Sequence, residues 1–274
     1  MSAPGSTYLY GAQVRANGIR QHYLRYGGQG PVLVLVPGIT SPAVTWGFVA
    51  ERLGRVFDTY VLDVRGRGLS EASPTLDYGL DACAADVAGL AQALGFSRFH
   101  LVGHSMGGRI GIRMAARHAT TLERLVMVDP PTSGPGRRRY PAQLPWYVDS
   151  MRLARRGITV EQMRSFCPTW TEEQLRLRAQ WLHTCDERAV VTTFDSFHQD
   201  DIHADLPRIS VPCLLMSAER GDVVSSEDEA EMRSLHPGLE TVRVPGAGHM
   251  IPWDNEEGFY AAFGRFLGTE IPTA

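Results

Sequence analysis

The segment Phe99–Arg109, FHLVGHSMGGR, constrains the fold more than any other part of the chain. An apolar run that starts at Phe99 predicts a strand, and a helical pattern continues to about His118. Between them lies Gly103–Gly107, in which Ser105 stands between two glycines. The sequence therefore predicts a strand, a sharp turn and a helix in direct succession.

The glycines on either side of Ser105 have a steric explanation. A serine on a sharp strand-to-helix turn projects its hydroxyl above the sheet, and side chains at Gly103 or Gly107 would collide with neighbouring backbone. The helix that follows points free N–H groups and its positive end at any oxyanion formed there. The alternative is an ordinary Gly/Ser turn, but the flanking strand and helix favour a nucleophile elbow.

Strands and helices alternate along most of the chain. The run Val32–Val36 is continuously apolar, which is typical of a central strand covered on both faces. An Asn17-Gly18 turn predicts a hairpin over Gln13–Tyr26. Further strands are predicted at Asp58–Asp63, Arg124–Asp129, Val211–Met216 and Glu240–Val244, and helices at Trp46–Leu53, Asp81–Leu94, Glu227–Leu235 and Glu256–Leu267. This alternation indicates an α/β fold with a mostly parallel sheet and helices on both faces.

The alternation stops after Pro131. Residues 132–206 contain helical patches rich in Trp, Arg and His, without a convincing strand. We therefore predict a core formed by residues 1–131 and 207–274, with residues 132–206 inserted as a helical cap over the ends of the strands.

Composition narrows the range of partners. A formal net charge of −3 gives no support for nucleic-acid or anionic-membrane binding, and no apolar run is long enough to span a bilayer. The N-terminal segment does not have a charged start followed by an apolar core, so we do not expect a signal peptide. The cysteines lie far apart in the sequence, without the spacing of a zinc site or a disulfide framework. We therefore expect reduced thiols and a cytoplasmic protein. The four residues are Cys83, Cys167, Cys185 and Cys213. The sequence carries no signal for an oligomeric state.

Three further motifs resemble those of the α/β-hydrolase superfamily. Val36–Gly38 resembles its oxyanion-loop segment, although Pro37 stands where histidine is common. Asp63–Ser70 matches its D-x-R-G-x-G-x-S loop, and Gly248-His249 matches the loop that carries its catalytic histidine. The resemblance covers nearly the whole chain and implies an eight-stranded, mostly parallel sheet with an inserted helical cap. It also implies an enzyme without a metal or another cofactor.

Within that superfamily, the chain is similar to the N-formylmaleamate deformylases of bacterial aerobic nicotinate degradation. The segments that carry this resemblance are Asn17–Tyr26, Val36–Ser41, Gly134–Arg137, Leu144–Ser150 and Ala247–Trp253. Those in the predicted cap are the most informative, because the core motifs are shared by many unrelated activities.

A serine hydroxyl is a weak nucleophile, so Ser105 requires a base to take its proton and a third group to hold that base. His249 is the predicted base, because it lies on a glycine-containing loop after the last strand, as the order Ser, Asp, His requires. His104 is interpreted as a packing residue at the end of its strand.

The acid has two candidate positions. Most of the superfamily places it after the strand that begins near Val211, where Glu219 and Asp222 are available. The other position follows the preceding strand, where Asp129 ends an apolar run and is expected to be buried; a buried carboxylate requires a partner such as an imidazole N–H. The resemblance to the deformylases also points to Asp129. We favour Asp129 and keep Asp222 as the alternative acid.

The predicted oxyanion donors are the backbone N–H groups of Ile39 and Met106. A small anionic amide substrate would also favour an arginine, whose guanidinium pairs with a carboxylate at two points. The sequence does not identify that arginine. The predicted cap also contains aromatic residues and a histidine that could line the pocket, although aromatic residues at such positions more often form the core of the cap. These residues are Trp146, Tyr147, Trp170, Trp181 and His183.

These residues and the resemblance predict a cofactor-independent hydrolase that deformylates N-formylmaleamate to maleamate and formate through a formyl-enzyme. An esterase, a lactonase or a C–C-bond hydrolase of another small substrate would use the same residues. A non-catalytic ligand receptor on the same fold is the alternative from a different class. Epoxide hydrolase and haloalkane dehalogenase chemistry is disfavoured, since those enzymes use Asp where this chain has Ser105.

Overall fold

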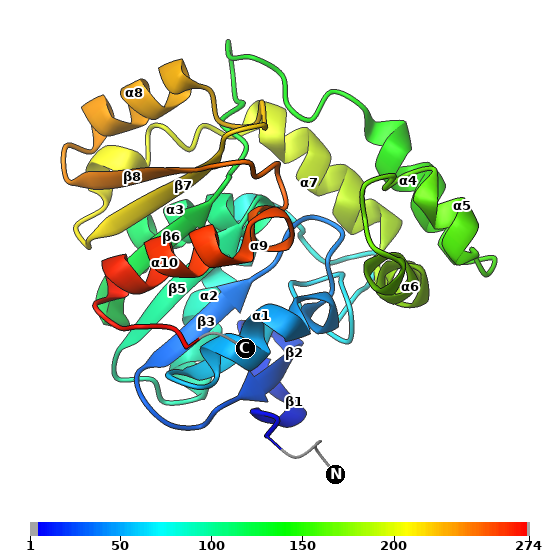
Figure 1. Cartoon of the computed structure of the whole chain (residues 1–274), viewed down its shortest axis with the longest axis horizontal. Coiled ribbons are helices and arrows are strands. Elements are labelled where there is room, and N and C mark those ends of the chain that lie inside the picture. The colour runs from blue at the N-terminus through cyan, green and yellow to red at the C-terminus, as the bar shows by residue number, and fades with distance from the viewer. Residues whose placement is uncertain (1–4, 273–274) are drawn as a thin grey trace.

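In a computed structural model that describes residues 5–272, eight strands form one sheet in the order β1-β2-β4-β3-β5-β6-β7-β8 (Figure 1). The strands are β1 Tyr8–Ala16, β2 Ile19–Tyr26, β3 Val32–Val36, β4 Asp58–Leu62, β5 Phe99–His104, β6 Leu122–Val128, β7 Cys213–Ala218 and β8 Leu239–Val244. Strand β2 is antiparallel to β1 and β4, and all other neighbours are parallel. The predicted eight-stranded, mostly parallel sheet is confirmed.

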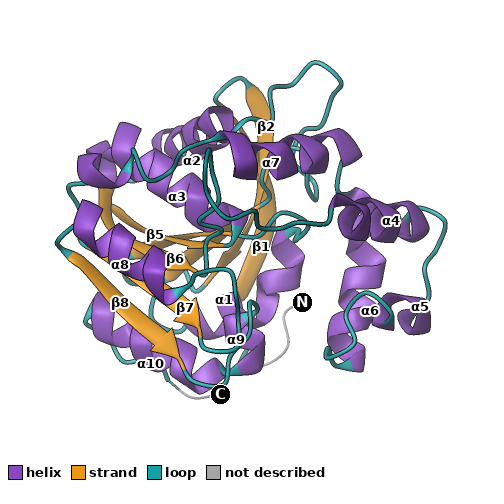
Figure 2. Cartoon of the chain, turned by 90° about the horizontal axis from the view of Figure 1, so that it is seen from above, coloured by secondary structure: helices purple, strands orange, loops and turns teal. Residues whose placement is uncertain are grey.

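Helices cover the sheet on both faces (Figure 2). Helices α1 (Gly47–Leu53) and α10 (Glu256–Leu267) pack on one face, and α2 (Leu80–Ala93) and α3 (Met106–Arg117) pack on the other. In β3, Leu33 and Leu35 belong to the apolar core on the side of α1 and α10. Val34 and Val36 belong to the core on the side of α2 and α3. Because successive side chains of a strand point to opposite faces, two covered faces require an uninterrupted apolar run.

The predicted core elements agree with the structure to within a few residues, except at the N-terminal hairpin. Strand β1 begins at Tyr8 and not at Gln13, since its alternating partly exposed residues carry a weak apolar signal. The predicted turn is correct. Asn17 and Gly18 adopt φ angles of 48° and 78°, as a two-residue hairpin turn requires.

Between β6 and β7, the described chain contains helices and single helical turns but no strand. The helices are α4 Leu144–Ala154, α5 Val160–Arg164, α6 Glu172–Trp181 and α7 Glu187–Gln199. Figures 1 and 2 both show α4, α5 and α6 at one side of the molecule, with α7 nearer to the sheet. Two short elements complete the fold, α8 (Ser226–Leu235) and α9 (Ile251–Asp254). No helix of residues 5–272 is long and apolar enough to cross a bilayer.

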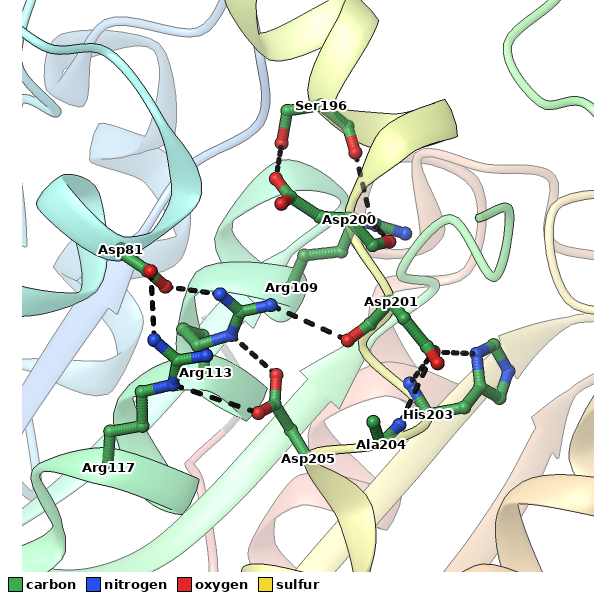
Figure 3. A network of polar contacts seen from close by, with 10 residues as sticks. All are labelled: Asp81, Arg109, Arg113, Arg117, Ser196, Asp200, Asp201, His203, Ala204 and Asp205. Atoms are coloured by element: carbon green, nitrogen blue, oxygen red, sulfur yellow. Dashed lines mark hydrogen bonds and ion pairs between the residues drawn. The ribbon is translucent and has the colours of Figure 1, made fainter. Parts of the chain in front are cut away.

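Two buried arginines of the core hold helix α7 near both of its ends. Arg67 donates from Nη2 to the Ala189 carbonyl at 3.1 Å and to Thr193 Oγ1 at 2.7 Å. Arg109 of α3 donates from Nη2 to the Asp200 carbonyl at 2.8 Å, just beyond the end of the helix (Figure 3). Helix α7 is therefore attached to the core by hydrogen bonds to buried cations as well as by apolar packing.

The same Arg109 side chain also holds the segment that follows β6. Its Nη1 donates to the carbonyls of Pro131 and Ser133, each at 2.8 Å. Burial lowers the pKa of Arg109 to about 10. Its neighbour Arg113 instead binds a carboxylate, with 2.5 Å between Nε and Asp205 Oδ2 (Figure 3). Arg109 thus joins α3, the segment after β6 and the end of α7.

We expect Arg109→Met to lower the free energy of unfolding by about 3 kcal/mol, because several buried carbonyls lose their donor at once. Urea unfolding followed by circular dichroism measures this change. Arg98→Met is the matched control, since the Arg98 side chain is largely exposed, and we expect a change within about 0.5 kcal/mol. Equal losses in the two variants would contradict the role given to Arg109.

Candidate active site

Ser105 occupies a strained turn between β5 and α3. Its φ and ψ angles are 54° and −116°, in a region that L residues rarely adopt. A Cβ added at Gly103 would lie 2.1 Å from the Gly107 carbonyl oxygen, and one added at Gly107 would lie 1.9 Å from the Val36 carbonyl oxygen. The predicted collision is confirmed, so the turn requires glycine at both positions.

Ser105 and His249 line the same cavity, which has a volume of about 400 Å³. Three of the five cap residues named from the sequence also line it, namely Trp146, Tyr147 and Trp170. The walls therefore combine loops at the carboxyl ends of the strands with side chains of α4 and of the segment before α6.

The other two residues named from the predicted cap do not line this cavity. Trp181 is the last residue of α6 and lines a separate cavity beside β1 and β2. His183 is exposed on the helical turn that follows. The sequence predicted helical patches in this segment, but the direction of each side chain depends on how α6 and the turn after it pack against the core.

Asp129 contacts the imidazole of His249. Its Oδ2 lies 2.7 Å from His249 Nδ1, and its Oδ1 accepts the Ala218 N–H at 3.2 Å. Asp129 follows β6 directly, is 1 % exposed and adopts a φ angle of 48°. Since a carboxylate only accepts, Nδ1 of His249 donates this bond and leaves Nε2 as an acceptor.

The alternative acids do not reach this imidazole. Asp222 is exposed on the loop after β7. Glu219 accepts the Gly246 N–H at 2.7 Å through its Oε2. Within residues 5–272, no hydrogen bond or ion pair joins either carboxylate to His249. The structure thus brings Asp129, and not Asp222, to the predicted base.

His104 supports the backbone of the loop that carries His249. Its Nε2 donates to the His249 carbonyl at 2.9 Å, and its ring lies 5.0 Å from the Trp46 ring. Burial, with a smaller contribution from nearby His249, lowers the pKa of His104 to about 3, so this imidazole is neutral. His104 packs at the end of β5 as expected, but its bond to the His249 backbone was not predictable from the motif.

The two predicted oxyanion donors belong to two segments that meet at Ser105. Met106 is the first residue of α3, so its N–H has no intrahelical acceptor. Ile39 follows Gly38 in the loop after β3 and lines the cavity. A Cβ added at Gly38 would lie 3.5 Å from Ser105 Cβ, which places this loop directly against the serine.

The loop Asp63–Ser70 supports the site without lining the cavity. Asp63 Oδ1 accepts the N–H of Ala43, near the end of the loop that carries Ile39, at 2.6 Å. Its Oδ2 lies 2.7 Å from His22 Nδ1. Arg65, on the same loop, pairs with Asp86. This loop therefore supports the oxyanion loop and does not form the cavity wall.

Arg178 of α6 is the only Arg or Lys among the described residues that line the cavity. It is 5 % exposed. Its Nη1 donates to the Thr40 carbonyl at 3.4 Å and its Nη2 to Thr40 Oγ1 at 3.2 Å. Its guanidinium carbon lies 5.4 Å from the Trp146 ring centre and 5.7 Å from that of Trp170. Nothing in the sequence distinguishes it from the other cap arginines.

Residues 5–272 contain no group of three or more His, Cys, Asp or Glu side chains that could hold a metal ion. The groups assembled around the cavity are a serine, a histidine–carboxylate pair, free backbone N–H groups and one guanidinium. This set suits acyl transfer to a serine hydroxyl.

Comparisons with known proteins agree with this arrangement. Residues 31–256 match the family model described as the alpha/beta hydrolase fold. An N-formylmaleamate deformylase from Pseudomonas putida is 64 % identical over 262 residues, which cover 96 % of this chain and 98 % of that protein. A 2-(acetamidomethylene)succinate hydrolase from Mesorhizobium japonicum is 26 % identical and covers 83 % of this chain and 84 % of its own length.

Among solved structures, an N-formylmaleamic acid deformylase from Pseudomonas putida S16 superposes with a TM-score of 0.90 at 56 % identity. The match covers 93 % of this chain and 100 % of that one. The resemblance to this group, predicted from the core and cap segments, is confirmed. The chain belongs to the alpha/beta hydrolase fold family.

Proposed function

We propose that this protein is a serine-dependent amide hydrolase that converts N-formylmaleamate to maleamate and formate. The identity of 64 % to a named deformylase over 96 % of the chain carries the choice of substrate. The cavity that contains Ser105, with a histidine held by a buried carboxylate, supports the hydrolytic chemistry.

Ser105 acts as the nucleophile, His249 as the general base and Asp129 as the residue that holds the base. Asp129 Oδ2, 2.7 Å from His249 Nδ1, fixes the ring with Nε2 free to take the serine proton. The Asp129 carboxylate also stabilises the imidazolium that forms. Asp222 has no part in this assignment, because it lies exposed on another loop.

The reaction takes two acyl-transfer steps. Ser105 Oγ attacks the formyl carbon while His249 Nε2 takes its proton, and the N–H groups of Ile39 and Met106 stabilise the oxyanion. The C–N bond then breaks, the proton passes to the leaving nitrogen, and maleamate departs from a formyl-serine ester. Water attacks the ester with His249 again as base, and formate leaves as Ser105 regains its proton. One such N–H donor contributes about 3 kcal/mol to transition-state stabilisation.

We also propose that residues 132–206 form a cap over this site. Trp146 of α4 and Arg178 of α6 line the cavity together with Ser105, so these helices form part of its wall. A cap in this position excludes water other than the attacking molecule and strengthens the electrostatic interactions within the cavity.

We expect Ser105→Ala to lower kcat for formate release by about 10⁴-fold or more, because no other group supplies the nucleophile. Formate released from N-formylmaleamate by purified protein is measured in a coupled dehydrogenase assay. Ser165→Ala, at an exposed position next to α5, is the matched control and retains activity. Absence of formate release by the unmodified protein would overturn the proposed substrate.

A fluorophosphonate separates a hydrolase from a non-catalytic receptor. We expect a covalent adduct at Ser105, detected by mass spectrometry of the digested protein, because His249 activates this hydroxyl. Labelling of the unmodified protein without formate release would favour a hydrolase of another small acyl substrate. No adduct would favour a receptor.

We expect Asp129→Asn to lower kcat by about 10⁴-fold, because an amide at this position favours the wrong imidazole tautomer. Asp222→Asn is the matched control and changes kcat less than about threefold, since Asp222 is exposed and is not joined to His249 by a hydrogen bond or ion pair within residues 5–272. Circular dichroism melting shows whether both variants fold. A large loss confined to the Asp222 variant would reverse the assignment of the acid.

A further inference from the structure

Buried arginines in this protein fall into two groups. Most donate to acceptors on several residues or to a carboxylate. Arg65 binds both oxygens of Asp86, at 2.6 and 2.5 Å, and Arg109 donates to four backbone carbonyls. Arg178 differs, because its two bonds reach only Thr40, at 3.2 and 3.4 Å, and because it lines the cavity that contains Ser105. Its buried Nε–H has no acceptor. The Nε–H of Arg109 also lacks one, but Arg109 is held by its four carbonyls and does not line this cavity.

No carboxylate among the described residues lies within ion-pair distance of Arg178. A buried cation without an anion is unfavourable, so such a group usually has a partner or a ligand. The rings of Trp146 and Trp170 lie near the guanidinium at 5.4 and 5.7 Å, where they restrict its orientation and exclude water. Within residues 5–272, Arg67 and Arg109 are also buried without a carboxylate, but each donates to several backbone carbonyls. Arg178 has only Thr40, and an anion that enters through the cavity would supply the partner that it lacks.

We propose that Arg178 is the specificity residue that binds the carboxylate of the substrate. A planar guanidinium can pair with a carboxylate at two points, and the unpartnered Nε–H supplies one of those donors. This inference relies on the proposed function for the identity of the acyl group, but the anion site depends on Arg178 alone.

The site is matched to one negative charge. Arg178 is the single cation of the cavity wall, and no Asp or Glu lines the same cavity among the described residues. A monocarboxylate neutralises it, whereas a dicarboxylate would place its second charge among apolar and neutral polar groups. The enzyme therefore selects small acyl amides that carry one carboxylate.

Arg178 also joins the carboxylate site to the oxyanion loop. It donates to the carbonyl of Thr40, the residue directly after Ile39, whose N–H is the proposed oxyanion donor. A carboxylate held on this guanidinium is thereby placed relative to the same loop that receives the reacting oxygen. Binding of the remote carboxylate therefore helps to align the formyl carbon with Ser105.

Binding of two matched ligands tests the proposal without any turnover. Maleamate carries one carboxylate, and maleamide replaces it with a neutral amide of similar shape. Isothermal titration calorimetry compares both ligands with the unmodified protein and with Arg178→Gln. We expect Kd for maleamate to rise at least about 30-fold in Arg178→Gln, as for loss of one partner of a buried charged pair. We expect Kd for maleamide to change less than about threefold.

Two further variants separate a charge effect from damage to the fold. Arg176→Gln changes an exposed arginine of the same helix, which pairs with Glu172, and leaves both Kd values unchanged. Arg178→Lys keeps the charge but not the planar fork, so its Kd for maleamate lies between those of the unmodified protein and Arg178→Gln. Maleate, the dianion, binds the unmodified protein no more tightly than maleamate does.

The outcomes distinguish this inference from the proposed function. Equal weakening of maleamate and maleamide, an unchanged Kd in Arg178→Gln, or no binding of maleamate to the unmodified protein would each overturn the anion site. Formate release by the unmodified protein is measured in parallel. Loss of maleamate binding in Arg178→Gln without formate release would instead retain the anion site and reject the deformylase assignment.

Discussion

The site depends on the contact between the start of helix α3 and the end of strand β3. Gly107 lies so close to the Val36 carbonyl that any side chain there would overlap backbone, and Gly103 is in similar contact with Gly107. Strands β3 and β5 are neighbours, paired from Leu33 to Val36, so two central strands fix this contact. The strained backbone of Ser105 persists because packing on both sides of the turn holds it.

From that contact, the remaining catalytic groups are positioned by the sheet. Asp129 follows β6, which pairs with β5, and His249 follows β8 at the sheet edge. His249 is held twice, through its ring by Asp129 and through its backbone carbonyl by His104. Residues at the carboxyl ends of β5 and β6 thus meet the loop that follows β8, because the carboxyl ends of parallel strands lie at the same edge of the sheet.

Local patterns were sufficient for the elements and for the residues inside motifs. The elbow, the order of strands and helices and the position of His249 all follow from runs and spacings within the sequence. The choice between Asp129 and Asp222 was harder, since both follow a strand and only their burial and direction differ. Trp181 and Arg178 lie three positions apart on α6 and line different cavities. Which of them faces the serine depends on how the helix docks, and the amino-acid pattern of α6 does not contain that information.

Arg109 and Arg178 are both buried, but they have different acceptors and different proposed roles. Arg109 donates from its two Nη atoms to four backbone carbonyls, so it contributes to the attachment of α7 with or without a ligand. Arg178 lies between α6 and the oxyanion loop, with acceptors on only one residue. Under the proposed assignment, the substrate carboxylate completes this set and favours the arrangement in which α6 contacts the loop. By linkage, whatever holds α6 against Thr40 then also strengthens substrate binding. The proposed specificity residue therefore lies on α6, whereas the nucleophile and its base follow strands of the sheet.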